Sequence, residues 1–302
     1  MERIQLLDLH FRNTPQAIAA FLVETQAGPV LIETGPHSTW PHLVEALRTH
    51  GYAPRDVSHV LLTHIHLDHA GAAWAFAQQG AQIYVHPKGA PHLANPQRLI
   101  SSARRIYQDE MDALWGRMEP IKADQLVVPE DEQQFEIGGV TFRALFTPGH
   151  AVHHIAWQVG EAIFCGDVAG VRVPGGIVVP PCPPPDIHIP HWLESIDRIK
   201  QSGATQLWLT HFGPVEEEVA SHLDALAARL LDWANWMRPF FEAGTPPAEV
   251  TPKFQQYVNA QLRQAGITTP EMHKRYELAN PAWMSVWGLL RYWEKIGSRA
   301  DE

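Results

Sequence analysis

The sequence is poor in cysteine, in basic residues and in long hydrophobic segments. Its 302 residues contain two cysteines, Cys165 and Cys182, which are too few for a disulfide framework and are compatible with a reducing compartment. No segment approaches the roughly twenty apolar residues that a membrane-spanning helix needs. Residues 1–8 lack the basic region and apolar stretch of a secretory signal. We therefore expect a cytoplasmic protein with no membrane partner.

Basic residues are outnumbered by acidic ones. The chain has 23 Lys and Arg against 33 Asp and Glu, for a formal net charge of -10, and its basic residues form no evident stripe. Binding to a phosphate backbone is therefore not expected, and a small-molecule substrate is favoured over a nucleic acid. The composition leaves the oligomeric state open. What the chain does have in quantity is histidine, at 18 residues.

The first half of the sequence alternates short apolar runs with amphipathic segments. Turn residues such as Ala27-Gly28-Pro29 separate the runs, and Val60-Leu61-Leu62 has the continuous apolar character of a strand covered on both faces. The pattern predicts strands at residues 4–9, 18–24, 30–33, 57–63 and 81–86, and helices at 38–49, 69–79 and 99–118.

The second half repeats this pattern. Strands are predicted at residues 125–128, 134–137, 140–146, 155–159, 162–165 and 206–210, with a helix at 191–201. Two groups of strands with intervening helices favour an α/β (α+β) fold, in which two mixed sheets pack face to face as a four-layer αββα sandwich. Seven prolines make residues 173–190 an irregular, stiffened loop.

The character of the chain changes near residue 214. Beyond it, helices are predicted at residues 215–242, 252–265, 270–278 and 281–296, punctuated by Pro and Gly. We expect a catalytic domain over residues 1–214 and a helical C-terminal extension over residues 215–302.

The densest chemical motif is Thr63-His64-Ile65-His66-Leu67-Asp68-His69-Ala70-Gly71, where a predicted strand gives way to a helix. In extended backbone His64, His66 and Asp68 project to the same side, while His69 turns with the helix. Imidazole and carboxylate groups suit zinc and other first-row divalent ions. The alternative, an N-capping Asp68 among surface histidines, explains the density of the motif less well.

The string His64-x-His66-x-Asp68-His69 resembles the signature of the metallo-β-lactamase superfamily. Three further segments resemble later motifs of that family in the expected order: Thr147-Pro148-Gly149-His150, Phe164-Cys165-Gly166-Asp167 and Leu209-Thr210-His211. The resemblance covers roughly residues 1–214. It implies that His64, His66 and His150 bind one metal ion, that Asp68, His69 and His211 bind a second, and that Asp167 bridges the two.

Two positions separate this chain from subsets of that family. Glu33-Thr34-Gly35 stands where many relatives have Asp-Thr-Gly, so the contacts behind the metal ligands are expected to shift. Asp167 stands where the true β-lactamases typically have cysteine, so antibiotic hydrolysis is not expected.

The resemblance implies a metal-dependent hydrolase. Two divalent ions, for which zinc is the first expectation and iron or manganese the alternatives, would activate a hydroxide for attack on an ester, thioester or lactone. Asp68 is the catalytic residue expected to orient that hydroxide and carry its proton. The helical C-terminal extension is similar to that of glyoxalase II, although it has no motif matched to glutathione.

Two other activities remain open. A phosphodiesterase or nuclease similar to ribonuclease Z would need a basic track, and a persulfide dioxygenase would hold one iron on His64, His150 and Asp167. For Cys165, and for the histidines and tryptophans outside the motifs, packing is the favoured role over substrate contact. These are His86, His92, His153, His154, His188, His191, Trp233, Trp236, Trp283, Trp287 and Trp293.

Overall fold

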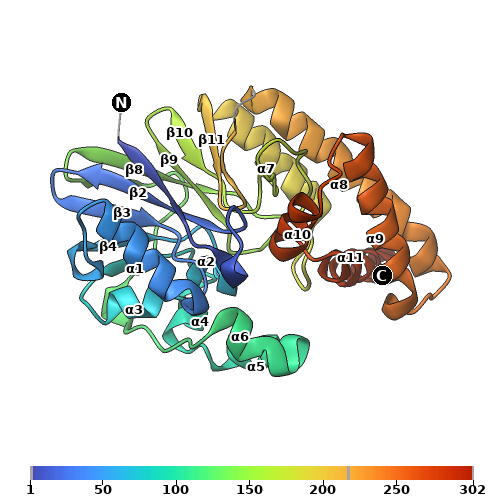
Figure 1. Ribbon diagram of the computed structural model, residues 1–302, viewed down its shortest axis with the longest axis horizontal. Helices are drawn as coiled ribbons and strands as arrows, with labels where there is room; N and C mark the ends of the chain where they lie inside the picture. Colours follow the sequence, from blue (N-terminus) through green and yellow to red (C-terminus); the bar gives the residue numbers. More distant parts are fainter. Residues whose placement is uncertain (1–2, 216–217, 301–302) are drawn as a thin grey trace.

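Two six-stranded sheets pack face to face, with helices on both outer sides (Figure 1). This is the architecture of the computed structural model, which describes residues 3–215 and 218–300. The predicted αββα sandwich is thereby confirmed.

The first sheet follows the order of the chain. Its strands are β1 (Ile4–Asp8), β2 (Ala19–Thr25), β3 (Gly28–Ile32), β4 (His59–Leu61), β5 (Gln82–Tyr84) and β6 (Leu126–Val127). The first three pair antiparallel, and Gly28, with a φ of 104°, allows the tight turn between β2 and β3. From β3 to β6 the strands are parallel, so they are linked by helical crossovers.

The second sheet has the order β12-β11-β10-β9-β8-β7. Its strands are β7 (Gln134–Ile137), β8 (Val140–Phe146), β9 (Ile155–Val159), β10 (Ala162–Phe164), β11 (Gln206–Leu209) and β12 (Gly213–Pro214). The pair β10 and β11 is parallel, with the helix α7 (Ile189–Gln201) between them in the chain, and the other neighbours pair antiparallel.

The helices between the strands are mostly short. They are α1 (Trp40–Thr49), α2 (Leu67–Ala70), α3 (Ala73–Ala77), α4 (Ala90–Ala94), α5 (Gln97–Tyr107) and α6 (Met111–Trp115). Single 3-10 turns occur at η1 (Phe11–Asn13), η2 (His37–Thr39), η3 (Pro54–Asp56), η4 (Gln108–Glu110) and η5 (Ala123–Gln125).

Two of the predicted helices are each divided. The helix expected at 69–79 is α2 and α3, separated at Gly71, where a Cβ would lie 2.4 Å from the Leu67 carbonyl oxygen and 2.9 Å from Pro36 Cα. This close approach ties the segment to the turn after β3. The helix expected at 99–118 is α5 and α6, because Gln108 takes a φ of 46° that interrupts the helix.

Large apolar side chains fill the space between the sheets. Phe21 of β2 packs on Phe164 of β10 with ring centroids 5.1 Å apart. Trp157 of β9 is fully buried, and its indole N–H donates to the carbonyl oxygen of Leu62 at 2.9 Å. This hydrogen bond fixes the backbone just beyond β4, two residues before His64.

The last four helices cover the outer face of the second sheet, at the right of Figure 1. They are α8 (Val219–Glu242), α9 (Pro247–Gln264), α10 (Pro270–Ala279) and α11 (Ala282–Ala300). The first of these helices was expected to start at residue 215, and residues 216–217 lie outside the described residues. Helix α9 begins earlier than predicted, since Pro247 occupies its first turn and Pro252 lies inside it.

These helices share one hydrophobic core with the sheet. Leu226 of α8 and Leu289 of α11 belong to the same buried cluster as Ile163 of β10 and Leu207 of β11. The division at residue 214 therefore stays a prediction. Among the described residues, none of the helices combines the length and hydropathy that crossing a bilayer demands.

Replacing Trp157 by phenylalanine should destabilise the protein because it leaves the buried Leu62 carbonyl without its donor. We expect Trp157→Phe to lower the free energy of unfolding by about 1–3 kcal/mol, measured by chemical denaturation. Trp208→Phe is the matched control, since the Trp208 indole N–H is buried and has no hydrogen-bond partner in the part of the chain that the structure describes. Equal losses in the two variants would contradict the role given to the Trp157 hydrogen bond.

Candidate metal centre

The segment after β4 places four polar side chains in six residues. The strand ends at Leu61, His64 is fully buried, and His66 is the N-cap residue of α2. Asp68 and His69 lie inside α2. The expected convergence of Asp68 with His64 and His66 is therefore wrong in its geometry: the backbone is no longer extended at Asp68, which joins His69 instead.

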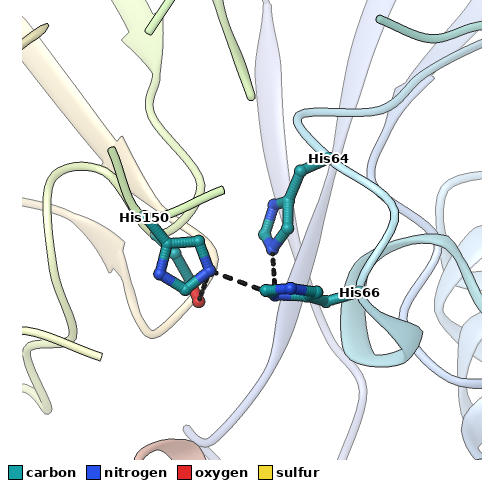
Figure 2. Close-up of side chains that lie close together, drawn as sticks. His64, His66 and His150 are labelled. Atoms are coloured by element: carbon teal, nitrogen blue, oxygen red, sulfur yellow. Dashed lines mark hydrogen bonds and ion pairs between the residues drawn. The ribbon is translucent and has the colours of Figure 1, made fainter. Parts of the chain in front are cut away.

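His64, His66, His150 and Asp167 form the first group, whose ligand atoms all lie within 4.8 Å of one another. Figure 2 shows the three imidazoles turned toward a common point. His66 Nδ1 is 2.9 Å from His64 Nε2 and 3.1 Å from His150 Nε2, and His150 Nε2 is 3.3 Å from Asp167 Oδ2. The group joins the end of β4, the turn after β8 and the end of β10.

Asp68, His69 and His211 form the second group. The Nε2 atoms of His69 and His211 lie 3.7 and 3.4 Å from Asp68 Oδ2. The same two nitrogens lie 3.3 and 3.5 Å from Asp167 Oδ1. One oxygen of Asp167 thus faces each group, which is the arrangement that a bridging carboxylate requires. All seven predicted residues are brought together.

Several imidazoles of this centre are oriented by an acceptor behind them. The Nδ1 atom of His211 lies 2.7 Å from the Ala17 carbonyl oxygen, and that of His150 lies 2.9 Å from the Pro181 carbonyl oxygen. His69 Nδ1 lies 3.1 Å from Glu33 Oε1. A nitrogen facing such an oxygen carries the proton, so the Nε2 lone pair points into the centre.

The buried polar atoms at the second group fit a cation. His69 Nε2, His211 Nε2 and Asp167 Oδ1 are buried and, within residues 3–215 and 218–300, have no hydrogen-bond partner. Leaving such atoms unpaired is costly, and imidazole and carboxylate are the donors that zinc, iron and manganese accept. The residues present therefore fit a divalent metal ion.

The electrostatics differ between the two groups. Burial lowers the pKa of His69 and His211, but the carboxylates of Asp167 and Asp68 outweigh it and raise both, so these two imidazoles lose a proton when a cation binds. Burial and the neighbouring histidines lower the pKa of His64 well below its usual value, and burial lowers the pKa of His150 to about 4. Burial opposes the charge on Asp68, but His69 and His211 outweigh it and lower its pKa to about 2. At neutral pH the imidazoles of His64 and His150 are therefore neutral and the Asp68 carboxylate is ionised.

Glu33 has a larger role than the sequence indicated. It is fully buried with a φ of 65°, and its Oε1 accepts from the Thr63 hydroxyl and lies 3.5 Å from Thr210 Oγ1. Since the Thr63 proton is used on Glu33, Thr63 Oγ1 accepts from His64 Nδ1 at 3.0 Å. One carboxylate thus orients His69 directly and His64 through a hydroxyl. The sequence signal for these contacts was a threonine directly before a histidine in two of the motifs, as Thr63-His64 and Thr210-His211.

Two of the remaining histidines lie beside the centre. His153 and His154 are buried, with ring centroids 6.2 and 5.1 Å from that of His64, and His154 Nδ1 contacts Thr147 Oγ1 at 2.8 Å. Neither belongs to the two groups.

The other candidates lie outside both groups. His86 packs on Phe146, and the His188 side chain caps α7 by accepting from the His191 amide. Cys165 is fully buried, which raises its pKa. Trp233 lies in the core with Trp236 and Trp293 packed against it, whereas Trp287 is 52% exposed.

Comparison with known proteins gives a family match over most of the chain. A sequence model of the metallo-β-lactamase superfamily matches residues 13–214. The solved structure of a metallo-β-lactamase family protein from Thermus thermophilus matches with a TM-score of 0.69 and 20% identity, covering 97% of this chain and 94% of that one.

Two curated relatives match shorter segments. A metallo-β-lactamase fold-containing protein of Sulfurisphaera tokodaii is 28% identical over 178 residues, which are 57% of this chain and 67% of that protein. An atrochrysone carboxyl ACP thioesterase of Aspergillus fumigatus is 33% identical over 156 residues, or 50% of this chain. The match spans only 40% of the thioesterase's own length.

Removing the shared carboxylate should disturb both groups at once. We expect Asp167→Ala to lower bound metal below the wild-type stoichiometry, because each of its oxygens faces one group. Elemental analysis of purified protein measures this, with His211→Ala as the comparison that removes a donor from the second group alone. An unchanged metal content in Asp167→Ala would argue against bridging.

Removing the carboxylate behind the ligands should weaken metal binding without removing a ligand. We expect Glu33→Ala to reduce zinc affinity about 10–100-fold, the usual effect of losing a partner that orients a ligand. Titration of metal-free protein with zinc measures the change, and Glu130→Ala, at an exposed glutamate, is the control. Wild-type affinity in a folded Glu33→Ala protein would refute this role.

Proposed function

Because this chain belongs to the metallo-β-lactamase superfamily, we propose that it is a metal-dependent hydrolase acting on an ester, thioester or lactone of a small molecule. The observation that carries the proposal is the position of Asp167, with one oxygen toward each of two histidine groups. A structural metal site is closed around one ion and has no use for such a shared carboxylate.

Two divalent ions, zinc by preference, would supply Lewis acidity and a water of lowered pKa at this centre. His64, His66 and His150 would hold one, and Asp68, His69 and His211 the other. Two features support these seven ligand roles. The side chains are imidazoles and carboxylates, and backbone or carboxylate oxygens behind His150, His211 and His69 aim their Nε2 atoms into the centre.

Asp68 is the residue of the centre best suited to handle a proton. Its side chain is 21% exposed, against 6% for Asp167, so it borders the solvent from which a nucleophilic water comes. As a carboxylate it is ionised at neutral pH. An anion there accepts a hydrogen bond from the attacking water, orients it, and takes its proton as the new bond forms.

The surroundings of Asp68 suit an uncharged acyl group. Leu67, its neighbour in α2, packs with Tyr107 of α5, and the Tyr107 hydroxyl lies 3.9 Å from Met284 Sδ of α11. The Tyr107 ring lies 5.9 Å from Trp283, also on α11. Burial, with a contribution from the Asp68 charge, raises the pKa of Tyr107, so its hydroxyl stays neutral and donates to Met284 Sδ.

Two further findings support this substrate class. The thioesterase of Aspergillus fumigatus acts, by its name, on an acyl group carried as a thioester, and it is 33% identical over half of this chain. The formal net charge of -10 disfavours a polyanionic substrate such as RNA.

Metal analysis followed by a substrate panel tests the proposal. Purified protein should contain two zinc or manganese ions per chain and should hydrolyse members of a panel of small esters, thioesters and lactones. One iron per chain with oxygen consumption on a persulfide would favour a dioxygenase instead. Cleavage of a phosphodiester with no cleavage of the acyl substrates would favour a nuclease.

Neutralising Asp68 should abolish turnover while leaving the fold intact. We expect Asp68→Asn to lower kcat by about 10²–10⁴-fold, the usual contribution of a general acid or base, with little change in melting temperature. The control is Asp109→Asn, at an exposed aspartate. Wild-type activity in a folded Asp68→Asn protein would exclude the mechanism.

A further inference from the structure

The proline-rich loop over residues 173–190 has few backbone N–H groups that could donate hydrogen bonds to its own carbonyl oxygens. Prolines have no backbone N–H, and three of them flank Cys182 as Pro180, Pro181 and Pro183. A buried carbonyl that lacks a donor is costly, so the donors must come from elsewhere.

Side chains of the C-terminal helices supply those donors. The Tyr276 hydroxyl donates to the Ile177 carbonyl oxygen at 2.6 Å, and Asn280 Nδ2 donates to that of Pro180 at 3.1 Å. Arg229 and Lys295 donate to the carbonyl oxygens of Val178 and Pro185. The loop is thus held along its length by side chains of α8, α10 and α11 and by Asn280, which lies between α10 and α11.

Three successive residues of the loop connect these helices to the metal centre. The Pro180 carbonyl accepts from Asn280, and the Cys182 amide donates to Ser285 Oγ at 3.4 Å. The carbonyl of Pro181, between them, faces His150 Nδ1 at 2.9 Å. The peptide group that orients His150 is therefore held on both sides.

The two helix-side residues also support each other. Ser285 is 1% exposed and its hydroxyl donates to Asn280 Oδ1 at 3.1 Å, which leaves the Asn280 amide group directed at Pro180. Behind them, a Cβ on Gly288 would lie 1.9 Å from the Cys182 carbonyl oxygen, so α11 packs directly on the loop backbone. There is little room for residues 180–182 to shift.

We propose that Asn280 and Ser285 are positioning residues for His150, through which the C-terminal helices set the affinity of the first group for its metal ion. The inference rests on the proposed metal site. Its physical basis is that a ring whose Nδ1 partner moves can no longer aim Nε2 at the shared ion, and the loss of such partners costs about 10–100-fold in affinity.

Zinc titration of Ser285→Ala tests the proposal. The variant is made in a His211→Ala background, where the second group has lost a ligand and the first group dominates binding. We expect zinc affinity to fall about 10–100-fold relative to His211→Ala alone. Cobalt titration followed by visible absorption gives a second readout, because its bands report the geometry of the bound ion.

Tyr276→Phe is the matched control. It removes a hydrogen bond from the same helices to the same loop, but at Ile177, away from residues 180–182. We expect a comparable loss of stability and unchanged zinc affinity. Equal losses of affinity in Ser285→Ala and Tyr276→Phe would overturn the proposal in favour of a general loosening of the loop.

A double-mutant cycle isolates the route through His150. In a His150→Ala, His211→Ala background, Ser285→Ala should cause no further loss of affinity, because the ring it positions is gone. A full additional loss there would refute the relay. If Ser285→Ala fails to fold, Asn280→Ala, at a half-buried position, carries the same test.

Failure of the proposed function is distinguishable from failure of this relay. Wild-type protein that binds no zinc, iron or manganese would remove the metal site itself. Wild-type protein that binds metal with an affinity insensitive to both Ser285→Ala and Asn280→Ala would remove only the positioning role.

Discussion

An ionised carboxylate inside a protein needs positive charge or hydrogen-bond donors close around it. Asp167 is 4% exposed, and its oxygens lie within 3.5 Å of the Nε2 atoms of His69, His150 and His211. Because the lone pairs of those nitrogens also point into the centre, a divalent cation held there would meet that need. These residues come from distant parts of the chain, at the ends of strands in both sheets. The face-to-face packing of the sheets is what brings β4, β10 and β11 close enough for their following residues to meet. The pairing of Phe21 with Phe164 and the Trp157–Leu62 hydrogen bond hold that arrangement.

The ligand candidates were predictable from the sequence because each lies in a short local pattern, a strand followed at once by histidine or aspartate. The sandwich was predictable for a similar reason, since alternating strands and helices leave few ways to cover two sheets. The geometry of Asp68 was not predictable in detail. Asp68 lies in α2, whose C-cap residue Gly71 approaches Pro36 closely, a tertiary contact that no local pattern reports. The same holds for Glu33, whose partners Thr63 and Thr210 lie 30 and 177 residues away.

The C-terminal helices show the limit of local patterns most clearly. Their existence follows from apolar spacing, but their relation to the rest of the molecule does not. The hydrogen bonds from Asn280 to Pro180 and between Ser285 and Cys182 join residues 100 and 103 positions apart. A proline-rich loop predicts stiffness, and it also implies that carbonyl donors must be found elsewhere. The hydrogen bonds that the C-terminal helices form with this loop connect them to the metal centre.

The order in which the chain is synthesised gives this connection a consequence in time. Chains emerge from the ribosome N-terminus first. His64, His66, His150 and Asp167 are therefore present well before Asn280 and Ser285, which lie more than a hundred residues further along the sequence. The candidate ligands of the first group are therefore synthesised before the helices proposed to position His150. Under the proposed relay, tight metal binding would depend on completion of the polypeptide, and an interrupted chain would hold a metal ion less firmly than a finished one.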